Sequence, residues 1–81
     1  MDEKRSLLTR NTYGKIHLKL KEIMDARGIT RYRLSQDTGT RFVVIDKWYK
    51  DNVEKLDLDV LARICYVLGC SVSDLLTYEE N

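Results

Sequence analysis

Apolar residues recur every three or four positions along most of the chain, which is the spacing of amphipathic helices. The first such stretch covers residues 14–27, and its apolar face consists of Ile16, Leu20, Ile23 and Met24. Gly28 follows where a residue with left-handed backbone would end a helix. The pattern therefore predicts a first helix over residues 14–27. The only histidine, His17, lies on its polar flank, and we expect it to be solvated.

Two further helices are predicted in the C-terminal part of the chain. Residues 58–68 have an apolar face made of Leu58, Leu61, Ile64, Cys65 and Leu68. Asp57 is a suitable N-cap for this helix, because its side chain can accept from free N–H groups of the first turn, and Gly69 ends it. Ser71, with Asp74 three residues later, has the spacing of a capping box and predicts a short last helix.

Between these segments, residues 30–50 predict two short helices joined at Gly39. Glycine can adopt the left-handed backbone that turns one helix sharply into the next. Ile45 and Trp48 share a helix face and can pack on Leu34. The spacing of a helix-turn-helix requires a small residue, a glycine, a branched apolar residue and a large apolar residue. Those positions hold Ser35, Gly39, Ile45 and Trp48.

The start of the first of these two helices carries positive charge where a helix prefers negative charge. Thr30 is a suitable N-cap, but Arg31 and Arg33 follow in the first turn. Two arginines are favourable there if an anion such as a DNA phosphate binds at this end. The alternative is a pair of solvated arginines on a surface helix.

Charge is also unevenly distributed along the chain, although the net charge is only +1. Residues 1–50 contain 12 basic and 6 acidic side chains, whereas residues 51–81 contain 2 basic and 7 acidic ones. A molecule with one basic end can turn that end toward a polyanion. The alternative is chance clustering, which is common in small domains.

The lack of proline and the scarcity of alternating apolar and polar runs favour an all-α fold. We predict a compact five-helix domain over residues 14–77, with the helix-turn-helix on helices 2 and 3. Residues 1–13 are predicted to be a flexible N-terminal arm and residues 78–81 a polar tail. The arm could alternatively contact DNA, or dock on the domain or a second subunit through Leu7 and Leu8.

The sequence gives little support to other classes of protein. Cys65 and Cys70 form neither a disulfide framework nor a zinc pattern, and free thiols favour a reducing, cytoplasmic setting. No secretory signal and no stretch long enough to span a membrane is visible. We find no nucleophile with a base and no glycine-rich phosphate loop, so we expect no enzyme activity, cofactor, metal or small-molecule ligand.

Several segments together resemble the Cro/repressor-type (Xre-like) helix-turn-helix family. Residues 20–30 are similar to the family's first helix and its entry into the second, and residues 58–76 to its fourth and fifth helices. The resemblance covers roughly residues 14–76. It implies a sequence-specific regulator of transcription that binds double-stranded DNA, and we expect a repressor. It also implies a homodimer that inserts helix 3, about residues 41–50, into the major groove.

The resemblance further implies which side chains contact DNA. Arg31 falls at the start of helix 2, where the family contacts DNA. Phe42 and Val43 fall at the leading base-reading positions of helix 3, and Lys47 falls one turn later. Phosphate contacts are expected from Thr40, Arg41, Lys50 and Asn52. The candidate site is completed in the first turn of helix 2 by Tyr32 and Arg33.

Phe42 and Val43 depart from the family, which often has polar side chains at these positions. Apolar side chains can contact thymine methyl groups but cannot make the bidentate bonds that read adenine or guanine. Specificity would then rest on Arg31 and Lys47 and on DNA shape. The alternative is a protein-interaction module on the same fold, such as an antitoxin or a regulator of another regulator, that docks through this apolar start of helix 3. The dimer surface is expected on helix 5 and the tail, with Tyr66, Val67, Val72 and Tyr78, and the alternative is that these are ordinary core or surface residues.

Overall fold

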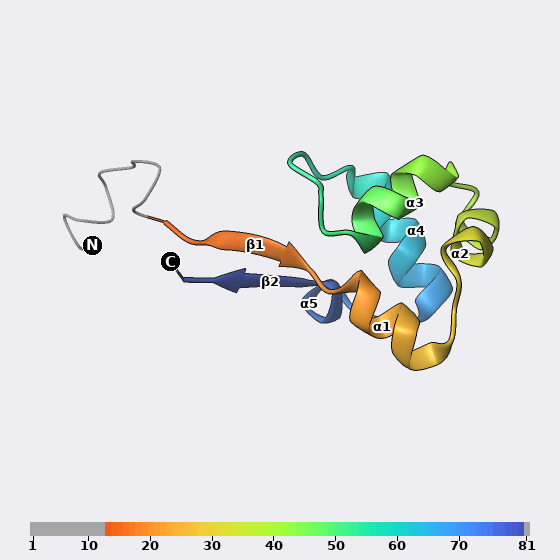
Figure 1. The fold of residues 1–81 in the computed structure, drawn as a ribbon, viewed down its shortest axis with the longest axis horizontal. Coiled ribbons are helices and arrows are strands. Elements are labelled where there is room, and N and C mark those ends of the chain that lie inside the picture. Colours follow the sequence, from red (N-terminus) through yellow and green to blue (C-terminus); the bar gives the residue numbers. More distant parts are fainter. Residues whose placement is uncertain (1–12, 81) are drawn as a thin grey trace.

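The computed structural model describes residues 13–80, which form five helices and two short strands (Figure 1). In chain order the elements are β1 (Lys15–Leu18), α1 (Leu20–Arg27), α2 (Arg31–Thr38), α3 (Phe42–Tyr49), α4 (Leu58–Leu68), α5 (Val72–Leu75) and β2 (Leu76–Glu79). The four helices predicted after Gly28 are confirmed. The predicted N-terminal arm lies outside the described residues except for Tyr13.

The chain is mostly helical but not all-α, because a strand occupies the first part of the predicted first helix. β1 pairs antiparallel with β2, with Ile16 opposite Tyr78 and Leu18 opposite Leu76. Apolar residues at positions 16 and 18 fit the period of a strand, just as 16 and 20 fit the period of a helix. The local pattern therefore did not separate the two. Tyr78 and Glu79, predicted to lie in a polar tail, belong to β2.

The paired strands, which we call the ribbon, project from the helical part at the end opposite α2 (Figure 1). At the base of the ribbon the Lys19 N–H donates to the Leu75 carbonyl at 2.7 Å, where β1 turns into α1. At its far end Gly14 approaches β2 so closely that a Cβ on this residue would lie 1.8 Å from the Glu79 carbonyl oxygen. The Gly14 N–H also donates to the Tyr78 hydroxyl at 2.9 Å.

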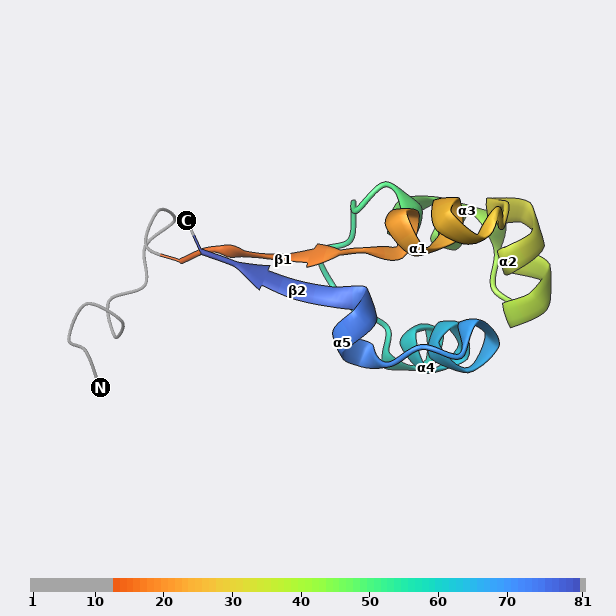
Figure 2. The ribbon, with the colours of Figure 1, turned by 90° about the horizontal axis from the view of Figure 1, so that it is seen from below.

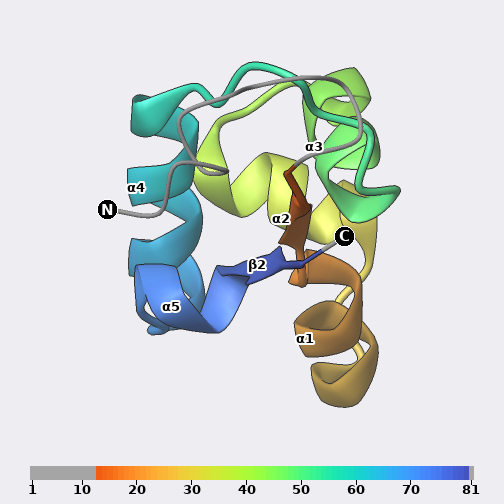
Figure 3. The same cartoon turned by 90° about the vertical axis from the view of Figure 1, so that its left-hand side faces the viewer.

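The helices enclose one core from two sides. Figures 2 and 3 show α1 and α3 on one side and α4 and α5 on the other, and in Figure 2 α2 closes the end far from the ribbon. The buried apolar side chains are Leu18, Leu20, Met24, Leu34, Ile45, Trp48, Val60, Leu61, Ile64, Leu68 and Leu75. Trp48 is only 2% exposed, which confirms its predicted burial between helices. Burial of Ile45 and Trp48 fixes which side of α3 faces outward.

The helix ends are capped as the sequence indicates. The Thr30 hydroxyl accepts from the Arg33 N–H at 3.1 Å, and the Asp57 carboxylate accepts from the Asp59 N–H at 2.9 Å. Asp74 accepts from the Ser71 N–H, which holds the pKa of this carboxyl below its usual range. Each cap satisfies N–H groups that have no partner within their own helix. In the described part of the chain, no helix is long and apolar enough to cross a membrane.

Candidate nucleic-acid interface

A tight turn joins α2 and α3, the two helices predicted to form the helix-turn-helix. Gly39 has φ 64°, the left-handed conformation that glycine adopts without steric cost, and its N–H donates to the Gln36 carbonyl at 3.2 Å. Ser35 is 8% exposed, so a small side chain stands where the helices approach closely. Arg63 of α4 donates to the Thr38 and Gly39 carbonyls at 3.4 and 3.3 Å. The turn is thus held by both neighbouring helices and α4.

α3 has one side in the core and one side in solvent. Ile45 and Trp48 are buried, whereas Phe42 is 46% and Val43 51% exposed. Lys47, one turn after Val43, is also exposed. The side chains predicted to reach bases therefore share the outer side of α3. Val44 lies between the two sides and packs partly against the core.

Arg31 is held against α3 rather than extended freely into solvent. Its Nη1 lies 2.5 Å from Oδ1 of Asp46. The other carboxylate oxygen of Asp46, Oδ2, lies 3.0 Å from Nζ of Lys50. The guanidinium carbon of Arg31 also lies 4.9 Å from the ring centroid of Tyr49 and 5.9 Å from that of Phe42. These distances suit attraction between a cation and the face of an aromatic ring.

Asp46 and Tyr49 organise this cluster, and neither residue is among those predicted from the sequence. The hydrogen bond from Lys50, together with the one from Arg31, outweighs partial burial and lowers the pKa of Asp46. The Tyr49 hydroxyl donates to the Asp25 carboxylate of α1 at 2.8 Å. The i, i+4 spacing of Asp46 and Lys50 was the available signal, because it permits an ion pair on one helix face. The contact with Arg31 required the tertiary structure.

Three more of the residues predicted to contact DNA are exposed to solvent. Arg33 Nε pairs with Asp37 at 2.9 Å on the surface of α2. Tyr32 is 62% exposed, and its hydroxyl accepts from the Gln36 amide at 3.0 Å. Arg41 is exposed immediately before α3. Within residues 13–80, neither Arg41 nor Lys47 forms an ion pair.

Thr40 and Asn52 differ in what they can offer to a phosphate. The Thr40 hydroxyl is buried and has no hydrogen-bond partner among the described residues, and its N–H already donates to Ser35. A phosphate contact through Thr40 therefore needs a local rearrangement. Asn52 is exposed, and its N–H donates to the Lys47 carbonyl at 2.9 Å, which leaves its side chain available.

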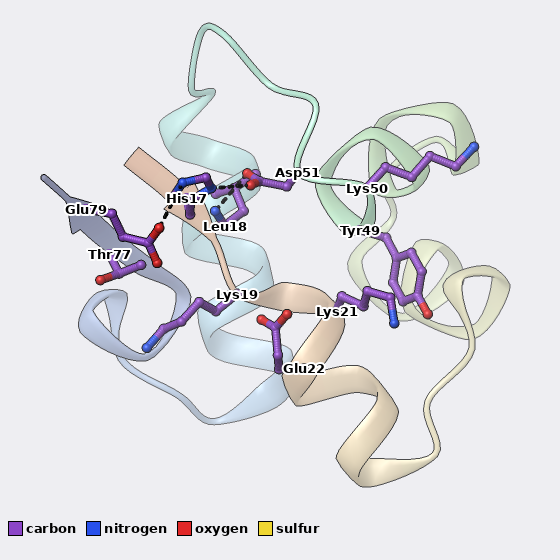
Figure 4. A pocket seen from close by; sticks show the side chains of 10 residues that line it. All are labelled: His17, Leu18, Lys19, Lys21, Glu22, Tyr49, Lys50, Asp51, Thr77 and Glu79. Atoms are coloured by element: carbon purple, nitrogen blue, oxygen red, sulfur yellow. Dashed lines mark hydrogen bonds and ion pairs between the residues drawn. The ribbon is translucent and has the colours of Figure 1, made fainter. Parts of the chain in front are cut away.

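We expected His17 to be solvated, but in the structure its side chain joins the ribbon to the end of α3 (Figure 4). Its Nδ1 lies 2.7 Å from Asp51 and its Nε2 lies 3.2 Å from Glu79. Asp51 has φ 57° and also accepts from the Leu18 N–H at 2.9 Å. Burial raises the pKa of Asp51, but the bonds from Leu18 and His17 outweigh it and lower the pKa below its usual value.

These residues line an open groove of about 470 Å³ between the ribbon and the end of α3. Figure 4 shows lysines as well as carboxylates around the groove, so neither sign of charge dominates it. No group of three or more side chains suited to hold a metal ion occurs in the described part of the chain.

The helical core and the tight turn between α2 and α3 are typical of helix-turn-helix domains. Comparison with protein families matches residues 19–81 to the Cro/C1-type HTH DNA-binding domain. The chain therefore belongs to this family, and the expected resemblance is confirmed. No curated protein matches the sequence.

Two solved structures share the fold at low sequence identity. A candidate DNA-binding protein from Bacteroides fragilis is 17% identical, with a TM-score of 0.67 over 78% of this chain and 100% of that chain. The transcriptional regulator VanUg is 20% identical, with a TM-score of 0.68 over 93% of this chain and 99% of that chain.

Proposed function

We propose that this protein is a sequence-specific regulator of transcription that inserts α3 into the major groove of double-stranded DNA. The observation that carries the proposal is the division of α3 between a buried side, fixed by Ile45 and Trp48, and an outer side with exposed Phe42, Val43 and Lys47. An α-helix fits the major groove, where each base pair presents a distinct pattern. Repression is the proposed mode of action, because it requires only occupancy of the DNA.

Affinity and specificity come from different residues in this proposal. Arg33, Arg41 and Asn52 lie exposed near the ends of α2 and α3 and would contact phosphates. Such contacts position the protein on the duplex without reading its sequence. Phe42 and Val43 would contact thymine methyl groups.

The test is selection of bound fragments from random duplex DNA at fixed, near-physiological salt. A dimeric regulator should enrich a two-fold motif with half-sites about 10 base pairs apart. An enriched single half-site would support reading of sequence but not the homodimer. Salt-sensitive retention without any enriched motif would contradict the proposal, because non-specific electrostatic binding gives that result.

A second candidate function is docking of another protein on the same face. The observation in its favour is the exposure of Phe42 and Val43 beside cations that Asp46 partly neutralises. An antitoxin or a regulator of another regulator would use such a surface. Weak, unselective DNA binding together with tight capture of a partner would favour this function over the first.

We also propose a homodimer that forms through the apolar side of the ribbon. Ile16 lies opposite Tyr78 and Leu18 opposite Leu76 along this side, and Ile16 and Tyr78 are 55% and 50% exposed. Val53 and Leu56 extend it into an apolar groove of about 380 Å³. An isolated two-stranded ribbon is marginally stable in water, so packing of two ribbons would stabilise both.

Sedimentation equilibrium tests this surface. We expect a dimer for the native chain and a monomer for Ile16→Glu, since a charge would have to be buried in the interface. Tyr66→Ser is the matched comparison, because Tyr66 is 89% exposed on α4 and was also predicted to lie in the dimer surface. Loss of the dimer in Tyr66→Ser alone would move the interface to α4.

A further inference from the structure

Asp46 places a negative charge on the side of α3 that carries the candidate DNA contacts. It follows Phe42 by one helical turn and precedes Lys50 by one turn. Its side chain is 21% exposed. DNA phosphates repel a carboxylate at such a surface, so its presence in a DNA-binding helix needs an explanation.

Both carboxylate oxygens of Asp46 are already in use within the protein. Oδ1 accepts from Arg31 at 2.5 Å and Oδ2 pairs with Lys50 at 3.0 Å. A cytosine amino group would therefore have to share Asp46 with Arg31 and Lys50. The three side chains together carry a charge of +1 instead of the +2 that Arg31 and Lys50 would present alone.

Arg31 also lies against the ring of Tyr49, which is itself held by groups of α1. Tyr49 lies under its guanidinium, and the Tyr49 hydroxyl donates to Asp25 of α1. Nζ of Lys21, on α1, lies 5.5 Å from the centroid of the Tyr49 ring. A guanidinium has five donors, so contacts to Asp46 leave others free to bind DNA in the orientation that the protein sets.

We propose that Asp46 is a specificity-determining residue that competes with acceptors on DNA for Arg31 and Lys50. The inference rests on the proposed function. Ion pairs between partly exposed side chains are weak, so a target site that offers well-placed acceptors can take over the two cations. A random sequence offers the same phosphates but lacks matching acceptors on its base edges, so it gains less from breaking these pairs. Asp46 thus lowers affinity for random DNA more than affinity for the target site.

The experiment compares the native chain with Asp46→Asn, which keeps the shape of the side chain and removes its charge. Binding is measured against a random-sequence duplex and against the duplex enriched by selection, over a series of salt concentrations. On random DNA we expect Asp46→Asn to bind about tenfold more tightly, with a salt dependence steeper by about one phosphate contact. The ratio of target to random affinity should fall.

Asp59→Asn is the matched control. Asp59 makes the same i, i+4 ion pair, with Arg63 at 2.9 Å, but lies on α4 outside the candidate interface. The Asp59→Asn substitution removes the same charge and should leave the ratio of target to random affinity near that of the native chain. Circular dichroism verifies that each variant is folded, and Asp46→Gln, which has a higher helix propensity, replaces Asp46→Asn if the latter is not.

Two results would overturn the inference, and they differ in what they say about the proposed function. Equal changes in Asp46→Asn and Asp59→Asn would show that only net charge matters, and would leave the DNA-binding function intact. If neither the native chain nor Asp46→Asn binds duplex DNA at low salt, the proposed function and this inference are both wrong.

Discussion

At the scale of single residues, Trp48 and Arg31 mark the two sides of α3. Trp48 is 2% exposed and joins the helix to the core, whereas Arg31 contacts its outer edge through Asp46, Phe42 and Tyr49. The burial of Trp48 could be predicted from its spacing to Ile45. The contacts of Arg31 could not, because they join residues from two helices.

Replacement of Trp48 tests the packing that orients α3. Trp48→Ala should cost about 3–5 kcal/mol, because it leaves a large cavity in a small core. That is a large part of the stability of a domain of this size, so we expect the variant to be largely unfolded. Urea denaturation followed by circular dichroism measures the loss. A native Trp48 emission maximum typical of full exposure to water would contradict the assignment.

Replacement of Arg31 tests the docking face. Arg31→Ala should weaken duplex binding and reduce its salt dependence by about one phosphate contact. Folding should survive, since pairs between exposed side chains contribute little to stability, about 1 kcal/mol or less. Anisotropy titrations at fixed salt provide the measurement, with Lys15→Ala on the ribbon as the charge-matched control. Equal affinities for Arg31→Ala and the native chain would argue against this face.

At the scale of secondary structure, the sequence predicted the elements whose determinants are local. α2, α4 and α5 carry their N-caps, Thr30, Asp57 and Ser71, within the same segment. β1 has only four residues and pairs with β2 at the other end of the domain. No local pattern records that pairing. Gly14 was the one available signal, because close approach of two backbones requires a glycine.

The ribbon depends on that glycine. Gly14→Ala would place a Cβ 1.8 Å from the Glu79 carbonyl oxygen, so the strands must separate at this end. We expect faster amide exchange in β1 and β2, with the helices unchanged. Hydrogen exchange followed by NMR resolves the two parts. Uniform acceleration across all helices would indicate instead that the ribbon is part of one cooperative unit with the core.

The junction between ribbon and α3 should depend on pH through Asp51. Its pKa in the folded state lies below the unfolded value, so its contribution to stability is present above that value and is lost as pH falls through the folded-state pKa. Asp51→Asn should lower the melting temperature near neutral pH. The difference should shrink as pH falls through the folded-state pKa of Asp51, because the carboxyl is then protonated in both the folded and the unfolded chain.

Glu54→Gln is the control for this experiment. Glu54 is exposed in the neighbouring loop and makes no ion pair within residues 13–80, so its removal should change the melting temperature little at either pH. A destabilisation of Asp51→Asn that is the same at both pH values would show that the charge of Asp51 is not what stabilises the junction.

At the scale of the whole molecule, the ribbon and α2 occupy opposite ends, with α3 between them (Figure 2). The sequence predicted the outer side of α3 because helical spacing defines which residues share a face. It did not predict the ribbon, and of the surface that we propose for the dimer it indicated only Tyr78. The resemblance implied two copies, but the exposed pair of Ile16 and Tyr78 appears only when distant segments are brought together.

Asp51 gives that arrangement a geometric consequence. The same carboxylate follows α3 and holds Leu18 and His17 of the ribbon. In the proposed dimer, these contacts help to set how far apart the two α3 helices stand, and hence how many base pairs separate the half-sites. The protein would then select DNA sites by the spacing between their half-sites as well as by the sequence of each half-site. A variant in which these contacts are altered would select the same half-sites at a different spacing.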